Sequence, residues 1–149
     1  MKLFAIAAVL GLATPSFSYT HKYTLSADAV YDDGHTSLSK VTCAHGEHGL
    51  LTHGHTTFEN LPTFPYIGGA PQILNSESSY CGSCWELTYT YGYGAHTRLN
   101  FTAIAAGGHG SDMFTISEMG FDHLTHSKGE DGKSVSITAV RKPASWCGL

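Results

Sequence analysis

The segment Leu61–Trp85 limits what this chain can fold into more than any other stretch of the sequence. It contains Gly68–Pro71, which reads GGAP, and it ends with the pair Cys81 and Cys84. Glycine adopts positive φ without steric cost and a residue before proline avoids the α region, so Gly68–Pro71 predicts a tight turn. Trp85–Tyr91 then alternates large and polar residues, which is the pattern of a half-buried strand. The cysteine pair therefore ties an irregular segment to the start of a strand.

The first residues have the pattern of a secretory signal. A charged start, Met1-Lys2, is followed by the apolar run LFAIAAVLGLA, and Pro15 and Ser16–Ser18 form a break and a small-residue cleavage site. The run is too short to span a bilayer. Met1–Ser18 is therefore predicted to be a signal peptide, and residues 19–149 a single domain. The protein is expected to be secreted, in the extracellular space or the cell wall, with no membrane span.

The cysteines indicate two disulfides. Cys43, Cys81, Cys84 and Cys147 are an even set in a chain predicted to be exported, although the sequence alone allows three pairings. The spacing of Cys81 and Cys84 is also that of redox dithiols. Redox pairs normally open a helix, whereas this pair opens a strand-like run, so the disulfide interpretation is favoured.

Short strands dominate the rest of the predicted domain. Trp85–Tyr91 and Arg98–Ile104 predict an antiparallel pair, and Ser37 is expected to cap one helical turn. The sequence from Thr115 to Glu118 matches a capping box, which predicts a helix running to about Leu124. Two further β-rich segments are Tyr23–Tyr31 and Ser134–Val140. These patterns predict one compact β-rich domain.

Charge and histidine content exclude several classes of partner. The formal net charge is −4 and no basic cluster occurs, which argues against nucleic acids and anionic membrane surfaces as partners. His45, His48, His53 and His55 lie within one glycine-rich loop, but they lack the spacing and the cysteine or carboxylate support of zinc sites. No metal or other cofactor is expected, and the histidines are interpreted as exposed loop residues.

No catalytic arrangement stands out. Hydrolysis of a glycosidic bond needs two carboxylates across the bond, and spacing singles out no such pair. The candidates considered are Asp28, Asp32, Asp33, Glu86 and Asp112. The G-x-S-x-G pattern of serine hydrolases is absent from the sequence. Asn100-Phe101-Thr102 is an N-glycosylation sequon, with Asn100 on the expected polar face of its strand.

The motifs of the chain resemble those of the cerato-platanin family of fungal proteins. The most specific are Phe64–Ala70, which reads FPYIGGA, and Cys81–Tyr89, which reads CGSCWELTY. Other matching segments are Val30–Leu38, Val41–Cys43, Gly49-Leu50, Thr57-Phe58, Leu61-Pro62, Leu124-Thr125, Ala139 and Cys147-Gly148. The resemblance implies a mainly β fold, a single six-stranded double-psi β-barrel with one or two short helices, related to the first domain of expansins. It also implies the disulfides Cys43–Cys81 and Cys84–Cys147.

The same resemblance implies a function. Cerato-platanins are secreted, non-catalytic proteins that bind chitin or N-acetylglucosamine oligomers and elicit defence responses in plants. For this chain the resemblance implies a carbohydrate-binding elicitor or virulence effector, with a plant host receptor as a further partner. The implied carbohydrate-binding residues are Asp28, Tyr31, Asp32, Asn75 and Ser76. An exposed surface with aromatic rings and carboxylates suits sugars, which offer apolar faces and hydroxyl edges.

The sequence departs from the family pattern at positions that bear on function. Ala105 stands where the family has an aspartate in the barrel groove, which argues against catalysis. Ile73-Leu74 replaces the Gly-Trp that family members carry before the residue matching Asn75. Two alternatives follow: a surface-active coat protein that self-associates at interfaces without sugar affinity, and an expansin-like protein that loosens polysaccharides. Ala105 disfavours the second of these.

Overall fold

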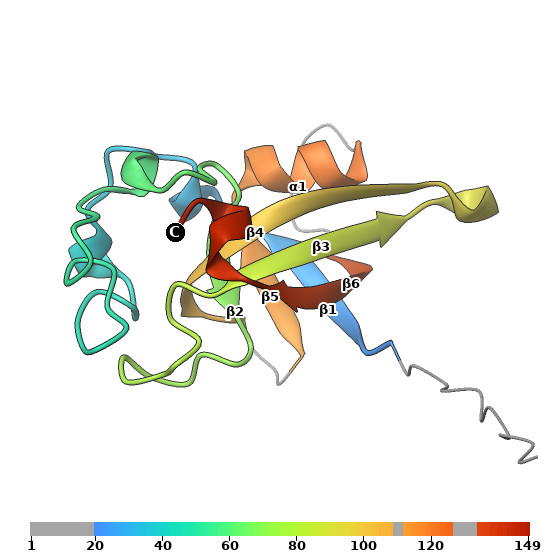
Figure 1. Cartoon of the computed structure of the whole chain (residues 1–149). Coiled ribbons are helices and arrows are strands. Elements are labelled where there is room, and N and C mark those ends of the chain that lie inside the picture. Colours follow the sequence, from blue (N-terminus) through green and yellow to red (C-terminus); the bar gives the residue numbers. More distant parts are fainter. Residues whose placement is uncertain (1–19, 109–111, 127–133) are drawn as a thin grey trace, which may run out of the picture.

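The computed structural model describes residues 20–108, 112–126 and 134–149. The predicted signal peptide, Met1–Ser18, lies outside the described residues. Six strands close into a barrel in the order β1-β5-β2-β4-β3-β6 (Figure 1). Their bounds are Lys22–Ala27 (β1), Ile67–Ala70 (β2), Cys84–Thr90 (β3), His96–Ala106 (β4), Met113–Ile116 (β5) and Ser134–Lys142 (β6). The pairs β1–β5 and β2–β4 are parallel, and the other neighbours are antiparallel.

Short helices complete the fold. The one α-helix in the described part of the chain, α1, spans Glu118–Thr125 and packs against β1 and β4. The 3-10 turns are Ala29–Tyr31 (η1), Leu38–Lys40 (η2), Phe58–Asn60 (η3), Gly92–Gly94 (η4) and Ala144–Cys147 (η5). The architecture confirms the expected mainly β fold, a closed six-stranded barrel with one short α-helix among the described residues. None of the described helices is long and apolar enough to cross a membrane.

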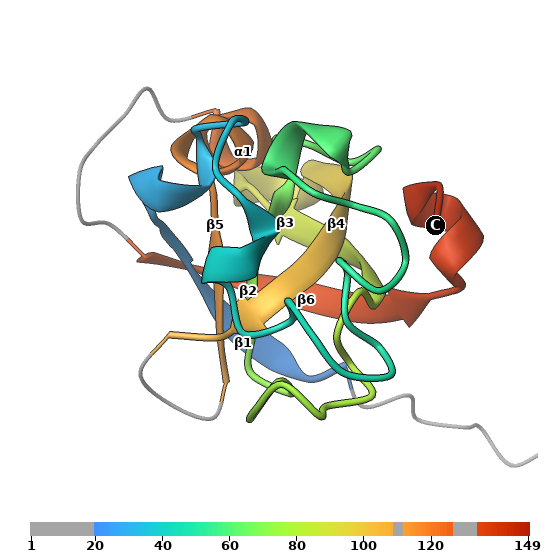
Figure 2. The same ribbon diagram turned by 90° about the vertical axis from the view of Figure 1, so that its left-hand side faces the viewer.

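The predicted pair of long strands is confirmed. β3 and β4 pair antiparallel with Trp85 opposite Phe101, and their hairpin extends from one end of the barrel (Figure 1). The segment between β1 and β2 covers the opposite end with irregular chain and faces the viewer in Figure 2. Within that segment Ser37 caps η2 as expected, since its hydroxyl accepts a hydrogen bond from the Ser39 N–H.

Gly68 and Gly69 do not form the predicted tight turn. Both are buried in β2, between β4 and β5. A Cβ atom on Gly68 would collide with the backbone carbonyl of Thr115, and one on Gly69 would collide with the carbonyl of Ala106. The glycines are therefore required because neighbouring strands approach closely, which is another known use of glycine within strands.

The predicted capping box is displaced. Thr115 and Ile116 belong to β5, and Ser117 is the N-cap of α1, with its hydroxyl accepting a hydrogen bond from the Gly120 N–H. Thr115 and Ile116 pair with β1 as part of the sheet, so they are not available for the helix start that the capping-box motif predicted. The β-rich segment Tyr23–Tyr31 is likewise shared between β1 and η1.

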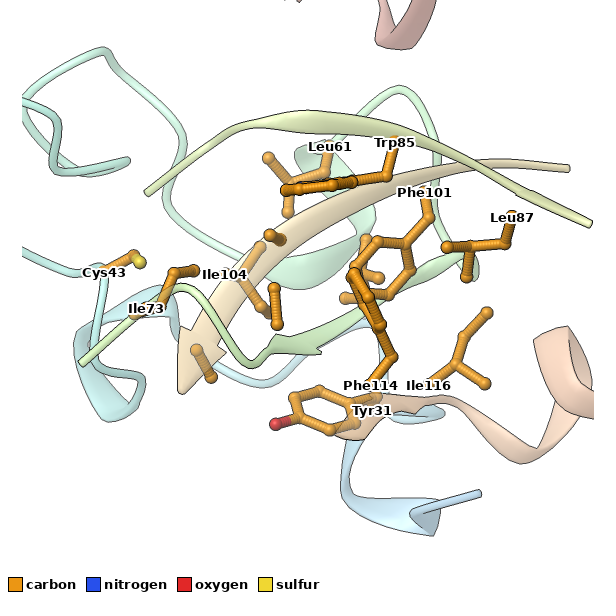
Figure 3. Packing of buried hydrophobic residues seen from close by; sticks show 14 of the residues in the cluster. Tyr31, Cys43, Leu61, Ile73, Trp85, Leu87, Phe101, Ile104, Phe114 and Ile116 are labelled. Atoms are coloured by element: carbon orange, nitrogen blue, oxygen red, sulfur yellow. The ribbon is translucent and has the colours of Figure 1, made fainter. Parts of the chain in front are cut away.

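The barrel interior is an aromatic and aliphatic core (Figure 3). Phe114 lies at its centre, fully buried, with its ring edge-to-face with three other rings. The centroid distances are 5.1 Å to Tyr23, 5.4 Å to Trp85 and 5.8 Å to Phe101. These contacts join β1, β3, β4 and β5 into one packing unit.

Two disulfides tie irregular chain to the barrel. Cys43 pairs with Cys81 and Cys84 pairs with Cys147, which confirms the pairing that the family resemblance implied. The first bridge holds the segment between β1 and β2 against the residues before β3. The second fixes the C-terminal turn η5 to the start of β3.

Candidate functional site

Three of the five implied carbohydrate-binding residues lie together on η1 and its caps. Asp28 is the exposed N-cap, and one carboxylate oxygen accepts a hydrogen bond from the Val30 N–H at 3.0 Å. The backbone N–H of Asp28 donates to the carbonyl of Ile116, which anchors η1 to the end of β5. The Asp28 side chain thus stands at the surface where β1 leaves the barrel.

Tyr31 faces inward from the same turn. It is only 7% exposed, and its ring packs 6.1 Å from that of Phe58. Burial raises the pKa of the Tyr31 phenol, while a hydrogen bond with the Thr115 side chain opposes the shift and the nearby Asp28 charge adds to it. The Thr115 hydroxyl also accepts a hydrogen bond from the Gly69 N–H at 3.0 Å. Tyr31 is therefore a neutral, fixed group that connects η1 with β5 and β2.

Asp32 caps the helix α1. Its two carboxylate oxygens accept hydrogen bonds from the N–H groups of Glu118 and Met119, at 2.9 and 3.0 Å. These N–H groups have no partner within the helix, and a carboxylate at a helix N-terminus also interacts favourably with the helix dipole. The sequence offered no local signal for this role, because the cap comes from a residue more than 80 positions earlier in the chain.

Replacing Asp32 with alanine is expected to lower the free energy of unfolding by about 1–2 kcal/mol, as for other lost N-terminal caps. The measurement is urea denaturation at neutral pH. Glu47→Ala removes the same charge from an exposed loop residue and is the matched control, with an expected change within about 0.5 kcal/mol. Equal effects of the two substitutions would show that Asp32 acts through net charge and not through the cap.

Asn75 and Ser76 form a second group. Both are exposed in the turn after β2, where the Asn75 side-chain oxygen accepts a hydrogen bond from the Glu77 N–H at 3.0 Å. The backbone there lies beside Gly46, since a Cβ atom on Gly46 would be 3.1 Å from the Ser76 carbonyl oxygen. The structure therefore brings together Asp28, Tyr31 and Asp32, and it places Asn75 and Ser76 separately, next to the histidine-rich loop.

Ala105 lies in β4, where the family pattern has an aspartate. It is buried, and the N–H of the next residue, Ala106, donates to the Thr42 hydroxyl at 3.3 Å. The other candidate carboxylates are held by structural partners: Glu86 pairs with Lys142 at 3.5 Å, Asp112 contacts His21, and Asp33 accepts from the His35 N–H.

The histidine-rich loop lines a cavity of about 400 Å³. His48, His53 and His55 face it together with Leu50, Cys81 and Leu149. The His53 ring donates through Nε2 to the Glu47 carbonyl at 3.1 Å. Within residues 20–108, 112–126 and 134–149, no three His, Cys, Asp or Glu side chains are arranged to hold a metal ion.

A second cavity, of about 440 Å³, was missed by the sequence analysis. We call it the C-terminal groove; its lining includes Phe64, Tyr66, Arg98, Asn100, His123 and Trp146. The one sequence signal for it is Trp146, a large aromatic residue beside Cys147 near the chain end, which is 51% exposed. The other lining residues come from distant segments, so only the fold assembles them.

The sequon residue Asn100 lies in this groove. It is half-buried in β4, and its side-chain Nδ2 donates to the Trp146 carbonyl at 2.9 Å. The expected polar face of the strand is therefore partly covered by η5. Glycosylation of Asn100 stays a prediction.

Comparison with known proteins places this fold and sequence in one group. The family model described as Cerato-platanin matches residues 23–149. The heat-stable 19 kDa antigen of Coccidioides immitis is 36% identical over 151 residues, covering 99% of this chain and 96% of that protein. The cerato-platanin of Ceratocystis fimbriata f. sp. platani is 29% identical over 133 residues, covering 89% and 92%.

Solved structures agree. Cerato-platanin 2 from M. perniciosa has a TM-score of 0.78 and 29% identity, covering 87% of this chain and 100% of that one. The solution structure of the fungal elicitor cerato-platanin has a TM-score of 0.66 and 28% identity, covering 83% and 95%. On the match over residues 23–149 and the shared barrel, this chain belongs to the cerato-platanin family, whose members are small secreted fungal proteins that are generally non-enzymatic.

Proposed function

We propose that this protein is a secreted, non-catalytic fungal protein that binds chitin or N-acetylglucosamine oligomers and acts as an elicitor or virulence effector in plants. The observation that carries the proposal is the family match over residues 23–149, since a solved relative with the same fold is described as a fungal elicitor. Secretion fits the two disulfides, which form in oxidising compartments. The partners proposed are the sugar oligomer and a receptor of the plant host.

The proposed sugar-binding residues differ in how much of each side chain is exposed and free to contact a ligand. Asp28, Asn75 and Ser76 are exposed and carry polar groups suited to hydroxyl edges. Tyr31 presents little of its ring, and the Asp32 carboxylate is engaged at the start of α1. We therefore assign direct contact to the exposed residues and a positioning role to Tyr31 and Asp32. Hydrolysis is not part of the proposal, because Ala105 supplies no acid in the barrel groove.

The test is an NMR titration of the oxidised protein with N-acetylglucosamine oligomers, with cello-oligomers as the control sugar. Saturable shifts are expected at Asp28, Asn75 and Ser76. Asp28→Asn replaces a charged acceptor with a neutral amide, and Asn75→Ala removes an amide group. Each should weaken binding roughly threefold to tenfold, since hydrogen bonds to charged groups are the stronger ones and a lost bond costs about 1 kcal/mol. Asp33→Asn, at an exposed residue whose side chain bonds only the nearby His35 N–H in the described structure, is the matched control and should leave binding unchanged.

Unchanged spectra at millimolar sugar would contradict the carbohydrate part of the proposal. The elicitor part is tested separately, by infiltrating leaves with the oxidised protein and with the Asp28→Asn variant. A defence response to both proteins alike would show that recognition by the plant does not depend on sugar binding.

A second candidate function is adsorption and self-association at interfaces. Exposed apolar side chains occur next to both groups of proposed sugar-binding residues. Leu74, which is 84% exposed, precedes Asn75, and Val30 on η1 and Met119 at the start of α1 lie near Asp32. Apolar side chains exposed at these two places offer contacts for adsorption or association. Film formation at an air–water interface, combined with unchanged spectra in the sugar titration, would favour this function over carbohydrate binding.

A further inference from the structure

We propose that the C-terminal groove is a binding site for acidic oligosaccharides, whose sugars carry a carboxylate. This site is distinct from the surface formed by Asp28, Tyr31 and Asp32. Figure 2 shows η1, in blue, and the C-terminal turn η5, in red, on opposite sides of the barrel. The inference therefore stands apart from the proposed binding of chitin or N-acetylglucosamine oligomers and does not depend on it.

Aromatic rings line the groove in a way that suits sugar rings. The rings of Tyr66 and His123 lie 5.3 Å apart and are inclined by 32°, which forms one wall. Trp146 stands on η5 and is half exposed, with the Lys142 ammonium 4.5 Å from its ring centroid on one face. Aromatic residues that combine an apolar body with a polar tip are common where ligands are partly apolar and partly wet. A pyranose ring, with an apolar face and hydroxyl edges, has that character.

The charge at the groove favours an anionic ligand. Arg98 lines it with an exposed guanidinium that makes no ion pair within the described residues. Lys142 stands beside Trp146, but its charge is already paired with that of Glu86 at 3.5 Å, so Arg98 supplies the charge available to a ligand. A carboxylate is also nearby, on Asp122, the residue before His123 on α1, and Asp122 already takes part in another interaction. A guanidinium binds a carboxylate through two parallel, charge-assisted hydrogen bonds, which are stronger than the bonds that it makes to the hydroxyls of a neutral sugar.

The groove is held in shape before any ligand arrives. The disulfide Cys84–Cys147 fixes η5 to β3, and the Asn100 side chain donates to the Trp146 carbonyl at 2.9 Å. Beneath, the hydroxyls of Thr63 and Thr102 form a buried hydrogen bond of 2.6 Å. A site whose walls are already ordered loses less conformational entropy on binding. Its volume, about 440 Å³, lies within the range of small-ligand sites, about 300–1,000 Å³.

The experiment is an NMR titration of the oxidised protein with galacturonate oligomers, and with neutral cello-oligomers of equal length for comparison. The protein is produced without N-glycosylation, because a glycan on Asn100 would occupy the groove. Saturable shifts are expected at Tyr66, His123 and Trp146 with the acidic oligomer alone. They should weaken as salt is raised, because the contact with Arg98 is electrostatic.

Variants test the charged contact of Arg98 and the aromatic contact of Trp146 separately. Arg98→Gln should weaken binding of the acidic oligomer about tenfold or more, Arg98→Lys should recover part of the loss, and Trp146→Ala should weaken it severalfold. Arg141→Gln is the matched control, since Arg141 is also exposed but lies over the Tyr80 ring, 4.7 Å from its centroid, and does not line the groove. Native-like spectra of the free variants verify that each has folded.

Several outcomes would overturn the inference. They are unchanged spectra at millimolar galacturonate oligomer, shifts confined to residues outside the groove, equal binding of the neutral oligomer, or an equal loss in Arg141→Gln. Failure of the chitin proposal is distinguishable, because that binding is expected to shift Asp28 and Asn75 and to be unaffected by Arg98→Gln.

Discussion

Phe114→Ala is expected to lower the free energy of unfolding by about 3–5 kcal/mol, the cost typical of removing a buried phenylalanine. Phe114 is fully buried beside Trp85 and Phe101 (Figure 3), and its ring contacts both of their rings and that of Tyr23. Removing the ring takes away its buried apolar surface and leaves a cavity facing aromatic side chains from β1, β3 and β4. Those strands are hydrogen-bonded into a closed barrel, so they have little freedom to move inward and fill the space.

The measurement is urea denaturation of the oxidised protein, followed by far-ultraviolet circular dichroism. Phe114→Leu keeps an apolar side chain at the same place and should cost less than Phe114→Ala. Val140→Ala, at an exposed position on β6, is the surface control and should change stability by no more than about 0.5 kcal/mol. A loss below about 1.5 kcal/mol in Phe114→Ala would show that the barrel relaxes into the cavity.

Removal of the Cys84–Cys147 disulfide is the second large effect. The bridge spans 63 residues, and in the chain-entropy model closing such a loop stabilises the folded state by about 4 kcal/mol. The double substitution of both cysteines by serine is therefore expected to lower the free energy of unfolding by about that amount. It should also loosen η5, because among the described residues the side-chain hydrogen bond that still holds this turn is the one from Asn100 to the Trp146 carbonyl.

The other disulfide provides the comparison. Cys43–Cys81 spans 38 residues, and the same model gives nearly the same stabilisation, about 4 kcal/mol, since the dependence on loop length is logarithmic. Urea denaturation should thus give similar losses for the two double variants. Their Trp146 signals should differ, because only the Cys84–Cys147 variant frees the turn that carries this residue. Identical behaviour of the Trp146 indole resonance in both variants would contradict the role assigned to the second bridge.

Phe114→Ala and removal of the Cys84–Cys147 disulfide are expected to affect ligand binding differently. Phe114 lies in the barrel interior, so Phe114→Ala should lower stability while the folded fraction keeps its surface. The Cys84–Cys147 bridge holds one wall of the C-terminal groove, so its removal should weaken any ligand there even under conditions where the barrel remains folded. The η1 surface, on the opposite side of the barrel, should be little affected (Figure 2).

Features with a local cause were predictable from the sequence. The alternation in Trp85–Tyr91 and Arg98–Ile104 arises because successive strand residues face opposite sides, and both strands are found where expected. The Ser37 cap depends on a neighbour two positions away and was also predicted correctly. The barrel could be expected only through the family resemblance. The same holds for the disulfide pairing, because four cysteines alone allow three pairings.

Features that depend on contacts between distant segments could not be predicted. Gly68 and Gly69 have the sequence of a turn, yet in the barrel they let β4 and β5 approach β2. Asp32 has no local sequence signal of a helix cap, yet it caps a helix far along the chain. A local sequence window records the preferences of neighbouring residues, while these two roles are set by atoms that become neighbours only when the barrel closes.

The candidate sites divide in the same way. From the sequence we predicted a disulfide-stabilised β-rich domain and, through the family resemblance, the residues proposed to contact a sugar. The structure was needed to show that Asn75 and Ser76 lie apart from η1, and that Tyr66, Arg98 and Trp146 share one groove. The physical reason is that the β2–β4 pairing and the Cys84–Cys147 bridge bring three remote segments together, and no pattern within any one of them encodes that meeting.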